Sequence, residues 1–334
     1  MQINVLSLFD GISCARVALE RAGIKVGKYY SSEVDMWANQ ISKKNWPDII
    51  YLGNVKAVSK KKVGKIDLLI GGSPCQDLSI AKSNREGLKG SRSNLFFEYV
   101  RILKEVKPKW FILENVASMP KEDRDVITKT LGVEPIMIDA ALVSAQTRKR
   151  YFWTNIPNVI QPKDRGIFLK DILEDIPIVP KGAEIREKSK TVRLGGRGSQ
   201  DGDKHEWDSV FQYRRSYWRE TKGGKVPTLT ANMGTGGNNV PYIIQRGRGF
   251  NKGGMRALNG KTPTISTSSW QDNNHLVQGK DKRKLTPTEC ERLQCLPDNY
   301  TQGVPSTKRY ETLGNAFNVE VVAHILKHLC KQKN

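Results

Sequence analysis

The chain has 334 residues, a formal net charge of +21 and 38% hydrophobic residues. This length supports a large core and two domains, and the charge favours a polyanionic partner, most simply nucleic acid, without separating DNA from RNA. No apolar stretch is long enough to cross a bilayer and the N-terminus lacks the pattern of a secretion signal, so we expect a cytoplasmic protein with no membrane partner.

The cysteine pattern disfavours a metal site. The five cysteines are scattered, at positions 14, 75, 290, 295 and 330, and none forms a Cys-x-x-Cys pair. The four histidines do not lie near them at the spacing of zinc ligands. We therefore expect reduced thiols, as in a cytosolic compartment, and no bound metal.

The first elements predict a nucleoside-binding α/β unit. A strand over residues 3–9 is followed by a turn at Asp10-Gly11 and a helix over 13–21, with Ser13 as its N-cap. A second strand over 25–31 leads to Glu33, roughly 20 residues beyond the turn, where a carboxylate can bind ribose hydroxyls. Because the turn lacks the three-glycine fingerprint of dinucleotide sites, adenosine without phosphates fits better than NAD.

A short apolar run over residues 68–70 predicts a buried parallel strand that leads through Gly71 and Gly72 to Cys75. Ligands of open α/β sheets bind beyond the carboxyl ends of the strands, so Cys75 is placed to meet a substrate. The alternative is a small buried cysteine, which is common. The polar, glycine-rich neighbours of Cys75 favour the first interpretation.

A second buried strand, over 110–113, delivers Glu114 to the same sheet edge. Further on, Arg148 and Arg150 alternate with Lys149 and therefore point to one face of an extended segment. The alternatives are an exposed loop acid and a solvated basic hairpin. Around these residues we predict helices over 95–106 and 121–131 and strands over 135–143 and 150–155.

The composition shifts near Ile156, and residues 221–280 are basic and glycine-rich. An internal echo relates residues 224–230, Gly-Lys-Val-Pro-Thr-Leu-Thr, to 260–266, Gly-Lys-Thr-Pro-Thr-Ile-Ser. We expect a catalytic domain over 1–155, a small irregular β domain over 156–280, and a segment over 281–334 that returns to the catalytic domain with helices over 286–293 and 319–329. Six arginines of the insert are candidates for phosphate or guanine contacts: Arg214, Arg215, Arg219, Arg246, Arg248 and Arg256.

These residue types suit methyl transfer to C5 of cytosine. A thiolate that adds to C6 makes C5 nucleophilic, a carboxylate near N3 and N4 assists the addition, and an arginine stabilises charge at O2. The methyl donor would be a sulfonium attached to adenosine, and loss of the C5 proton then releases the thiolate. Positive charge near the cysteine would favour the reactive thiolate form.

In its motifs and their order the chain resembles the DNA (cytosine-5) methyltransferases, over essentially its whole length. The stretches 71–81 and 138–153 look close to animal de novo methyltransferases, and the compact length looks bacterial or viral. The resemblance implies an α/β, Rossmann-like S-adenosylmethionine-dependent domain with a mixed, mostly parallel sheet and a smaller, irregular β-rich target-recognition domain. The similar motifs are Leu8-Phe-Asp-Gly-Ile, Gly72-Ser-Pro-Cys-Gln, Glu114-Asn-Val, Gln146-x-Arg148-x-Arg150, Arg283 to Pro297 and Gly314-Asn-Ala-Phe.

The resemblance also implies roles for single residues. Cys75 would be the nucleophile, Glu114 the ring-binding acid, and Arg148 and Arg150 a clamp on the pyrimidine and phosphate. Further residues would line the S-adenosylmethionine site, namely Phe9, Asp10, Gly11, Glu33, Val34, Asn54, Val55, Pro74, Leu95, Asn315, Ala316 and Phe317. DNA contacts would come from Gln76, Ser79, Gln146, Arg214, Arg215, Arg246 and Arg248.

Two departures from the family pattern concern the cofactor. The first motif has Asp10-Gly-Ile-Ser where a glycine-richer turn is usual, and Asn54 stands where the family usually has an aspartate near the adenine amine. The asparagine carbonyl can still accept that hydrogen bond, so we expect binding to survive.

The expected substrate is double-stranded DNA whose target cytosine is flipped out of the helix, because stacking hides C6. The expected setting is restriction-modification, by a monomer in a bacterial cell or phage-infected host. The alternatives are an RNA (tRNA) cytosine-5 methyltransferase of the same fold and a non-catalytic DNA-binding relative.

Overall fold

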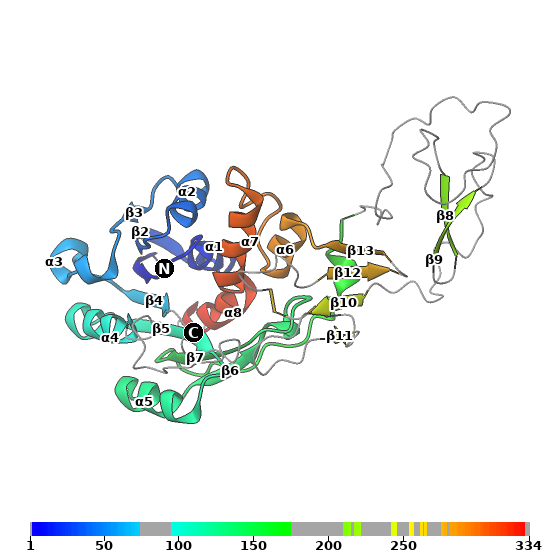
Figure 1. Cartoon of the computed structure of the whole chain (residues 1–334). Helices are drawn as coiled ribbons and strands as arrows, with labels where there is room; N and C mark the ends of the chain where they lie inside the picture. The colour runs from blue at the N-terminus through cyan, green and yellow to red at the C-terminus, as the bar shows by residue number, and fades with distance from the viewer. Residues whose placement is uncertain are drawn as a thin grey trace.

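A seven-stranded sheet in the order β3-β2-β1-β4-β5-β7-β6 forms the centre of the computed structural model (Figure 1). Strands β1 to β5 pair in parallel, and β7 runs antiparallel to both β5 and β6. The mixed, mostly parallel sheet confirms the predicted fold class. The structure describes residues 2–73, 95–174 and 281–330, and between the last two it describes 210–214, 217–221, 242–245, 254–256, 261, 262, 264, 265 and 275–278.

Strands and helices alternate along the chain from β1 to β6, and three helices, α6 to α8, close the main body. The strands are β1 (Gln2–Leu8), β2 (Lys25–Ser32), β3 (Ile50–Tyr51), β4 (Leu68–Gly72), β5 (Trp110–Val116), β6 (Ile136–Asp139) and β7 (Lys149–Thr154). The helices are α1 (Cys14–Arg21), α2 (Met36–Asn45), α3 (Lys60–Val63), α4 (Leu95–Val106), α5 (Lys121–Leu131), α6 (Pro287–Leu293), α7 (Ser306–Asn315) and α8 (Val319–Cys330). None of the described helices is long and apolar enough to cross a bilayer.

Strand alternation divides the core between the two faces of the sheet. Leu68 and Ile70 of β4 pack into one cluster with α1 and α8, and Leu69 packs into a second with Phe96 and Tyr99 of α4. Each such side chain contributes about 1.5–3 kcal/mol when it is fully buried. The two clusters fix the sheet between two helical layers, and so fix which side chains emerge at its carboxyl edge.

Local signals account for most helix ends. Helix α6 begins with a capping box between Thr286 and Glu289, and α5 ends at Gly132 in the left-handed conformation. The prediction that Ser13 caps α1 was wrong. Its side chain accepts no helix N–H, because the residue has a φ of 59° and its Oγ donates to Asp10 Oδ2 at 2.7 Å.

Other predicted elements differ in length. The strand predicted over 135–143 ends at Asp139, whose carboxylate accepts from Ala141 N at 3.0 Å and starts a 3₁₀ turn over Ala140–Leu142. Helices α2 and α7 were not predicted. The Asp35 carboxylate caps α2 by accepting from Trp37 N at 2.8 Å, so a start signal was present in the sequence.

Antiparallel strands form the remaining sheets, in keeping with the expected β-rich insert. A four-stranded sheet has the order β11-β10-β12-β13, and β8 pairs with β9. Residues 156–174 instead pack on the main body, where Leu169 and Ile172 join the core. The bounds are β8 (Val210–Arg214), β9 (Tyr217–Thr221), β10 (Tyr242–Gln245), β11 (Gly254–Arg256), β12 (His275–Gln278) and β13 (Asp281–Lys284).

Candidate active site

The chain that leads to Cys75 is tied to the neighbouring strand β5. Asn115 Nδ2 donates to Ser73 Oγ at 3.1 Å and to the Ser73 carbonyl at 3.4 Å, and all of these groups are buried. Ser73 lies two residues before Cys75. Cys75 itself, with Pro74, Gln76 and Ser79, falls outside the described residues. The structure therefore anchors the entry to the Cys75 segment at the carboxyl edge of β4 and β5.

Glu114 and Arg150 form an ion pair at this edge. Arg150 Nε lies 2.8 Å from Glu114 Oε1, and the two side chains are only 16% and 13% exposed. Val116 of β5 is the register partner of Arg150, so Arg150 and Glu114 are diagonal neighbours on one face. A small cavity beside the pair is lined in part by Phe152 and Phe317. This arrangement offers a carboxylate and a guanidinium together to a planar polar ring.

Arg148 does not present its guanidinium to this cavity as a free clamp. It is 4% exposed, and Nη2 donates to the Ala316 carbonyl at 2.9 Å and the Gly314 carbonyl at 3.2 Å. Nη1 reaches the Ile265 carbonyl at 3.4 Å. Arg148 therefore joins the stretch before β7 to the end of α7 and to residue 265. Of the two predicted clamp residues, Arg150 pairs with Glu114, whereas the guanidinium of Arg148 is held by backbone carbonyls.

A short piece of the insert is built into the main body next to Arg148. Thr262 N donates to the Ala145 carbonyl at 2.7 Å, and Thr147 N donates to the Thr262 carbonyl at 2.8 Å. Lys261 Nζ binds the carbonyls of three residues of the body, namely Ala141, Ser144 and Ile167.

Gln146, predicted to contact DNA, is fully buried where this piece pairs with the body. In this conformation the buried Gln146 side chain cannot contact a DNA base. Of the other predicted DNA contacts, Arg214 lies in β8, and Arg215, Arg246 and Arg248 fall outside the described residues.

The turn after β1 is held by Glu33. The Glu33 carboxylate accepts from Gly11 N at 2.8 Å through Oε2, and from Val34 N at 2.7 Å and Asp35 N at 2.9 Å through Oε1. A carboxylate has about four acceptor positions, so one remains for a ribose hydroxyl. Burial raises the pKa of Glu33, although the three N–H donors oppose this shift. Phe9, with a φ of 56°, closes the turn beside it.

The neighbouring surface suits an adenine ring. Val34 is 70% exposed despite its apolar side chain. Asn54 is also exposed, and its Oδ1 accepts from Lys56 N at 3.0 Å, which leaves a second lone pair on that oxygen. Val55 is buried beneath it and starts a 3₁₀ turn. An apolar surface, a free carboxylate position and an amide oxygen fit the adenosine part of S-adenosylmethionine.

The Asp10 side chain is engaged inside the turn after β1. It is buried, and its two carboxylate oxygens accept from Tyr29 Oη and Ser13 Oγ, each at 2.7 Å. These contacts make the Asp10 side chain an internal brace of the turn, and the predicted contact between Asp10 and the cofactor stays a prediction. The sequence pattern could not show the brace, since Tyr29 comes from the next strand.

The remaining predicted cofactor residues lie around Phe317. Its ring packs closely against Gly72, and Ala316 is buried beside it. Asn315 ends α7 and is exposed, and Leu95 begins α4 and is half-buried. These residues frame the same carboxyl edge of the sheet as Glu33 and Glu114, so the structure brings the predicted cofactor and catalytic groups to one side.

The sequence model of the C-5 cytosine-specific DNA methylases matches residues 3–331. The chain belongs to this family. It is 27% identical to the type II methyltransferase M.HhaI of Haemophilus parahaemolyticus, over 99% of this chain and 95% of the relative. It is 28% identical to the orphan methyltransferase M.SPRI of Bacillus phage SPR, over 98% of this chain and 97% of the relative.

Solved structures share the fold at lower identity. A prophage-encoded DNA modification methyltransferase of E. coli superposes with a TM-score of 0.63 at 21% identity, over 98% of this chain and 99% of that chain. The methyltransferase EhMeth of Entamoeba histolytica gives 0.64 at 17% identity, over 100% and 99%.

The family membership confirms three predictions. The chain is a DNA (cytosine-5) methyltransferase, it transfers a methyl group to C5 of cytosine in DNA, and its methyl donor is S-adenosylmethionine.

Proposed function

We propose that this methyltransferase takes its target cytosine out of duplex DNA and methylates it through a covalent bond between Cys75 Sγ and C6. Glu114 and Arg150 hold the ring. The observation that carries the proposal is the 2.8 Å ion pair between these two side chains, at the edge where the chain leaves β4 towards Cys75. Extrusion costs a few kcal/mol of stacking and pairing, and is required because C6 is hidden in the duplex.

The four cysteines that the structure describes favour Cys75 as the nucleophile by exclusion. Burial raises the pKa of Cys14 and Cys290, and raises that of Cys295 to about 11. These three groups therefore supply little thiolate at neutral pH. Cys330 lies at the end of α8, next to the carbonyl of Ala22. Cys75 is the remaining cysteine of the chain and follows a strand end.

The reaction has three steps at the ring: addition of the thiolate, methyl transfer and elimination. When Cys75 Sγ bonds to C6, the electrons of the C5–C6 double bond move towards C5, while Glu114 hydrogen-bonds at N3 and N4 and Arg150 stabilises charge at O2. S-adenosylmethionine supplies the methyl group that C5 takes up. A base then removes the C5 proton, the double bond re-forms, and Cys75 leaves as a thiolate.

In this scheme the ion pair fixes the orientation of the acid. Arg150 binds Oε1 of Glu114, so the second oxygen, Oε2, stays directed to the side of Gly72. A carboxylate held in one orientation reduces the entropy lost when the ring binds. Arg150 Nη1 is held by the carbonyl of Lys149 at 2.9 Å, which limits the guanidinium as well.

The relatives support a proposal for the biological setting. They are type II or orphan methyltransferases of bacteria and phages. We place this chain as a monomer in a bacterial cell or a phage-infected host, where it modifies DNA in a restriction-modification system or as an orphan enzyme. The net charge of +21 suits the phosphate backbone of a duplex.

Expression in a bacterial strain that lacks cytosine methylation tests the proposal. We expect 5-methylcytosine in one sequence context for the wild type and none for Cys75→Ala, with DNA binding retained in the purified variant. Sequencing that discriminates 5-methylcytosine reads the outcome in both DNA and RNA. Methylation by the variant, or methylation confined to RNA, would contradict the proposal.

A further inference from the structure

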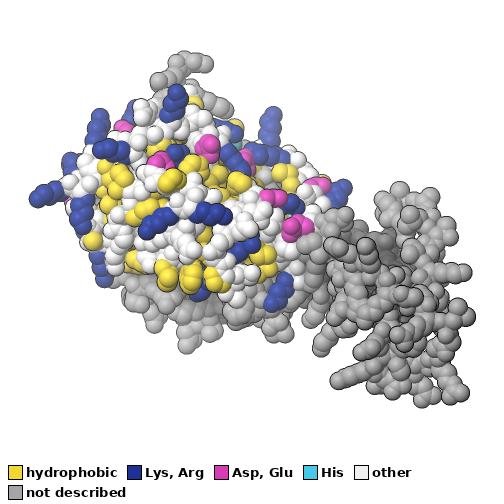
Figure 2. Space-filling view, turned by 90° about the horizontal axis from the view of Figure 1, so that it is seen from above, with side chains coloured by type: hydrophobic (Ala, Val, Ile, Leu, Met, Phe, Trp, Pro, Cys, Tyr) yellow, Lys and Arg dark blue, Asp and Glu magenta, His cyan; other side chains and the backbone are white. Residues whose placement is uncertain are grey.

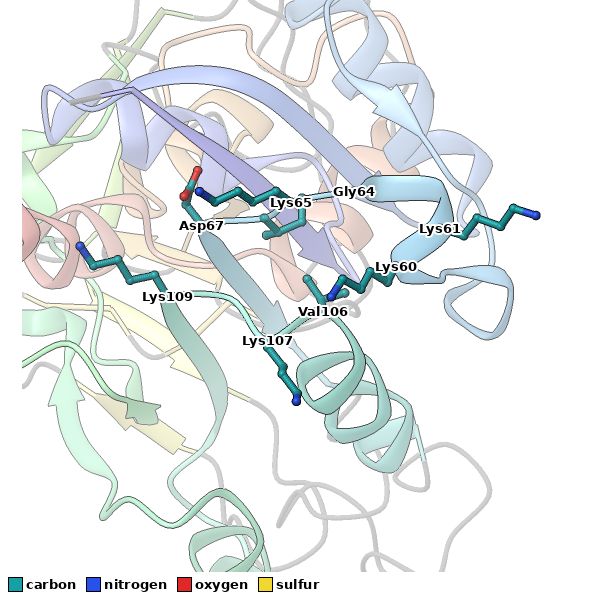
Figure 3. A pocket seen from close by; sticks show the side chains of 9 residues that line it. Lys60, Lys61, Gly64, Lys65, Asp67, Val106, Lys107 and Lys109 are labelled. Carbon is teal, nitrogen blue, oxygen red and sulfur yellow. The ribbon is translucent and has the colours of Figure 1, made fainter.

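A second hollow, lined largely by lysines, lies at the amino edge of the sheet, opposite to the carboxyl edge that holds Glu114. It has a volume of about 820 Å³ and opens between α3 and the turn that joins α4 to β5, at the amino ends of β4 and β5 (Figure 3). Five of its nine lining residues are lysines: Lys60, Lys61, Lys65, Lys107 and Lys109. We call these five side chains the lysine rim.

The charge of the lysine rim exceeds that of the acids beside it, since Glu105, which accepts from Lys60 N at 2.8 Å, is paired with Arg101. All five lysines are exposed, and the lining contains one acid, Asp67. The Asp67 carboxylate is already engaged, because its Oδ2 accepts from Asn4 N at 2.8 Å. Five positive charges thus surround a hollow with one negative charge, which favours binding of an anion. Figure 2 shows Lys and Arg side chains standing out from the end of the molecule where α3 lies.

The backbone that carries the lysine rim is anchored in the core. Val63, Ile66 and Val106 are buried and alternate with the lysines along the chain. Gly64 and Lys107 turn the chain with φ values of 67° and 48°. Lys109 Nζ lies 4.3 Å from the centre of the Trp110 ring, which limits its range. The charges therefore stand on fixed turns of the main body.

The chemistry of the rim indicates an extended polyanion. Among the nine lining residues there is no arginine, histidine or hydroxyl group, so the planar, bidentate recognition of a single small anion is not built here. Figure 3 shows the side chains of Lys61 and Lys107 pointing in different directions, and one small ion cannot meet both. None of the exposed large hydrophobic side chains of the described residues lines the hollow, as insertion into a membrane surface would require.

Distance separates the rim from DNA bound at the catalytic edge. Strands β4 and β5 have five and seven residues, and so extend about 17–23 Å between the two edges. A straight duplex at the carboxyl edge does not reach the amino edge. We propose that the lysine rim binds the sugar–phosphate backbone of a second DNA segment while the first segment occupies the catalytic edge. DNA is the polyanion that this enzyme already handles.

A pair of matched triple variants tests this second site. Lys61→Gln, Lys65→Gln and Lys107→Gln together remove three charges from the rim. Lys129→Gln, Lys170→Gln and Lys327→Gln remove three charges from exposed positions on α5, the 3₁₀ turn over Leu169–Asp171 and α8. The probe is a cytosine-free duplex prepared in two portions, one with a donor and one with an acceptor fluorophore. Energy transfer in a mixture of the two portions reports one protein bound to two duplexes.

We expect the wild type and the control variant to bring the two duplexes together, and the rim variant to bind one duplex without doing so. We also expect the dependence of log K on log salt concentration to become shallower by about 2–3 for the rim variant alone, at about 0.9 for each lost phosphate contact. Energy transfer that persists in the rim variant would overturn the proposal. An equal loss of energy transfer in the rim and control variants would also overturn the proposal. The same holds if the rim variant loses binding only to vesicles of anionic lipid and not to DNA.

Discussion

Gly72 and Glu114 are register partners on β4 and β5, and a Cβ atom added to Gly72 would lie 3.0 Å from Glu114 Oε2. The same atom would lie 2.7 Å from Cε1 of Phe317. A Cβ contact shorter than 3.0 Å essentially never occurs, and one at 3.0 Å is tighter than most, so the close approach of these three residues favours glycine at position 72. The glycine thus lets the acid, the aromatic ring and the entry to Cys75 share one edge.

We therefore expect Gly72→Ala to lower the methylation rate by about 10-fold or more, because overpacking costs roughly 1–3 kcal/mol and displaces Glu114 or Phe317. Single-turnover methylation of plasmid DNA measures the rate. Gly72→Ala combined with Phe317→Leu removes the closest clash and should recover part of the loss. A Gly72→Ala enzyme with the wild-type rate would show that the edge has more room than the structure gives it.

The Glu114–Arg150 pair should act as one unit. Glu114→Gln should slow methylation by about 10²-fold or more, in the range of a lost acid–base group, with little change in S-adenosylmethionine affinity. Arg150→Lys should also slow it, and the double variant should cost less than the sum of the two. Lys121→Gln breaks the exposed Lys121–Asp125 pair, 2.5 Å, and serves as the control with no effect on rate. Additive losses at Glu114 and Arg150 would refute the shared role.

Arg148 distinguishes a positioning role from a clamp on the substrate. Arg148→Met leaves three carbonyls without their charged donor, so we expect a loss of about 2–4 kcal/mol in the free energy of unfolding. Arg148→Lys should restore part of both stability and rate. Urea unfolding and single-turnover methylation measure the two quantities on the same samples. A clamp would instead lose rate in Arg148→Lys at unchanged stability.

Glu33 should set the affinity for S-adenosylmethionine. Glu33→Gln replaces the charged acceptor, and a hydrogen bond to a charged group contributes about 1.5–3 kcal/mol, so the dissociation constant should rise about 10-fold or more. Calorimetric titration with S-adenosylmethionine measures this directly. Duplex DNA binding should stay unchanged, since Glu33 lies at the ends of β1 and β2. An unaltered affinity would remove the residue from the cofactor site.

Asp10 should give the fold a pH dependence. Burial raises its pKa above the usual value, opposed by hydrogen bonds from Ser13 and Tyr29. The folded protein then holds the Asp10 proton more tightly than the unfolded chain, so the contribution to stability is present below about pH 4 and is lost as the pH rises through the folded pKa. Asp10→Asn cannot ionise. Relative to this variant, the wild type should therefore lose stability in urea unfolding as the pH rises above about 4; a difference that stays constant with pH would contradict the shift.

Local sequence signals predicted the elements whose own residues mark where they begin and end. The apolar spacing over α4 and the closing Gly132 of α5 gave both helices their observed bounds. The apolar runs of β4 and β5 placed Cys75 and Glu114 after neighbouring strands, and the register of Gly72 with Glu114 agrees with that placement. Such signals need only a few adjacent residues, so one sequence was enough to interpret them.

Contacts between distant segments were beyond this kind of inference. Alternation predicted that Arg148 and Arg150 point to one face, and both line the small cavity beside Glu114, but it could not show that Ile265 and residues 314–316 bind the guanidinium of Arg148. Gln146 is buried by the same piece of the insert. Whether a polar side chain meets solvent depends on parts of the chain more than a hundred residues away, and the local sequence pattern does not contain that information.

Trapping of the covalent adduct tests the central role of Cys75 most directly. Kilobase-long duplex DNA in which every cytosine carries fluorine at C5 blocks the last step, because no C5 proton can leave and the bond between Cys75 Sγ and C6 persists. With S-adenosylmethionine present, we predict a denaturation-resistant complex whose digestion gives the Cys75 peptide bearing a methylated nucleotide, and no complex for Cys75→Ala. An adduct on another residue, or none from an enzyme that methylates ordinary DNA, would contradict the account.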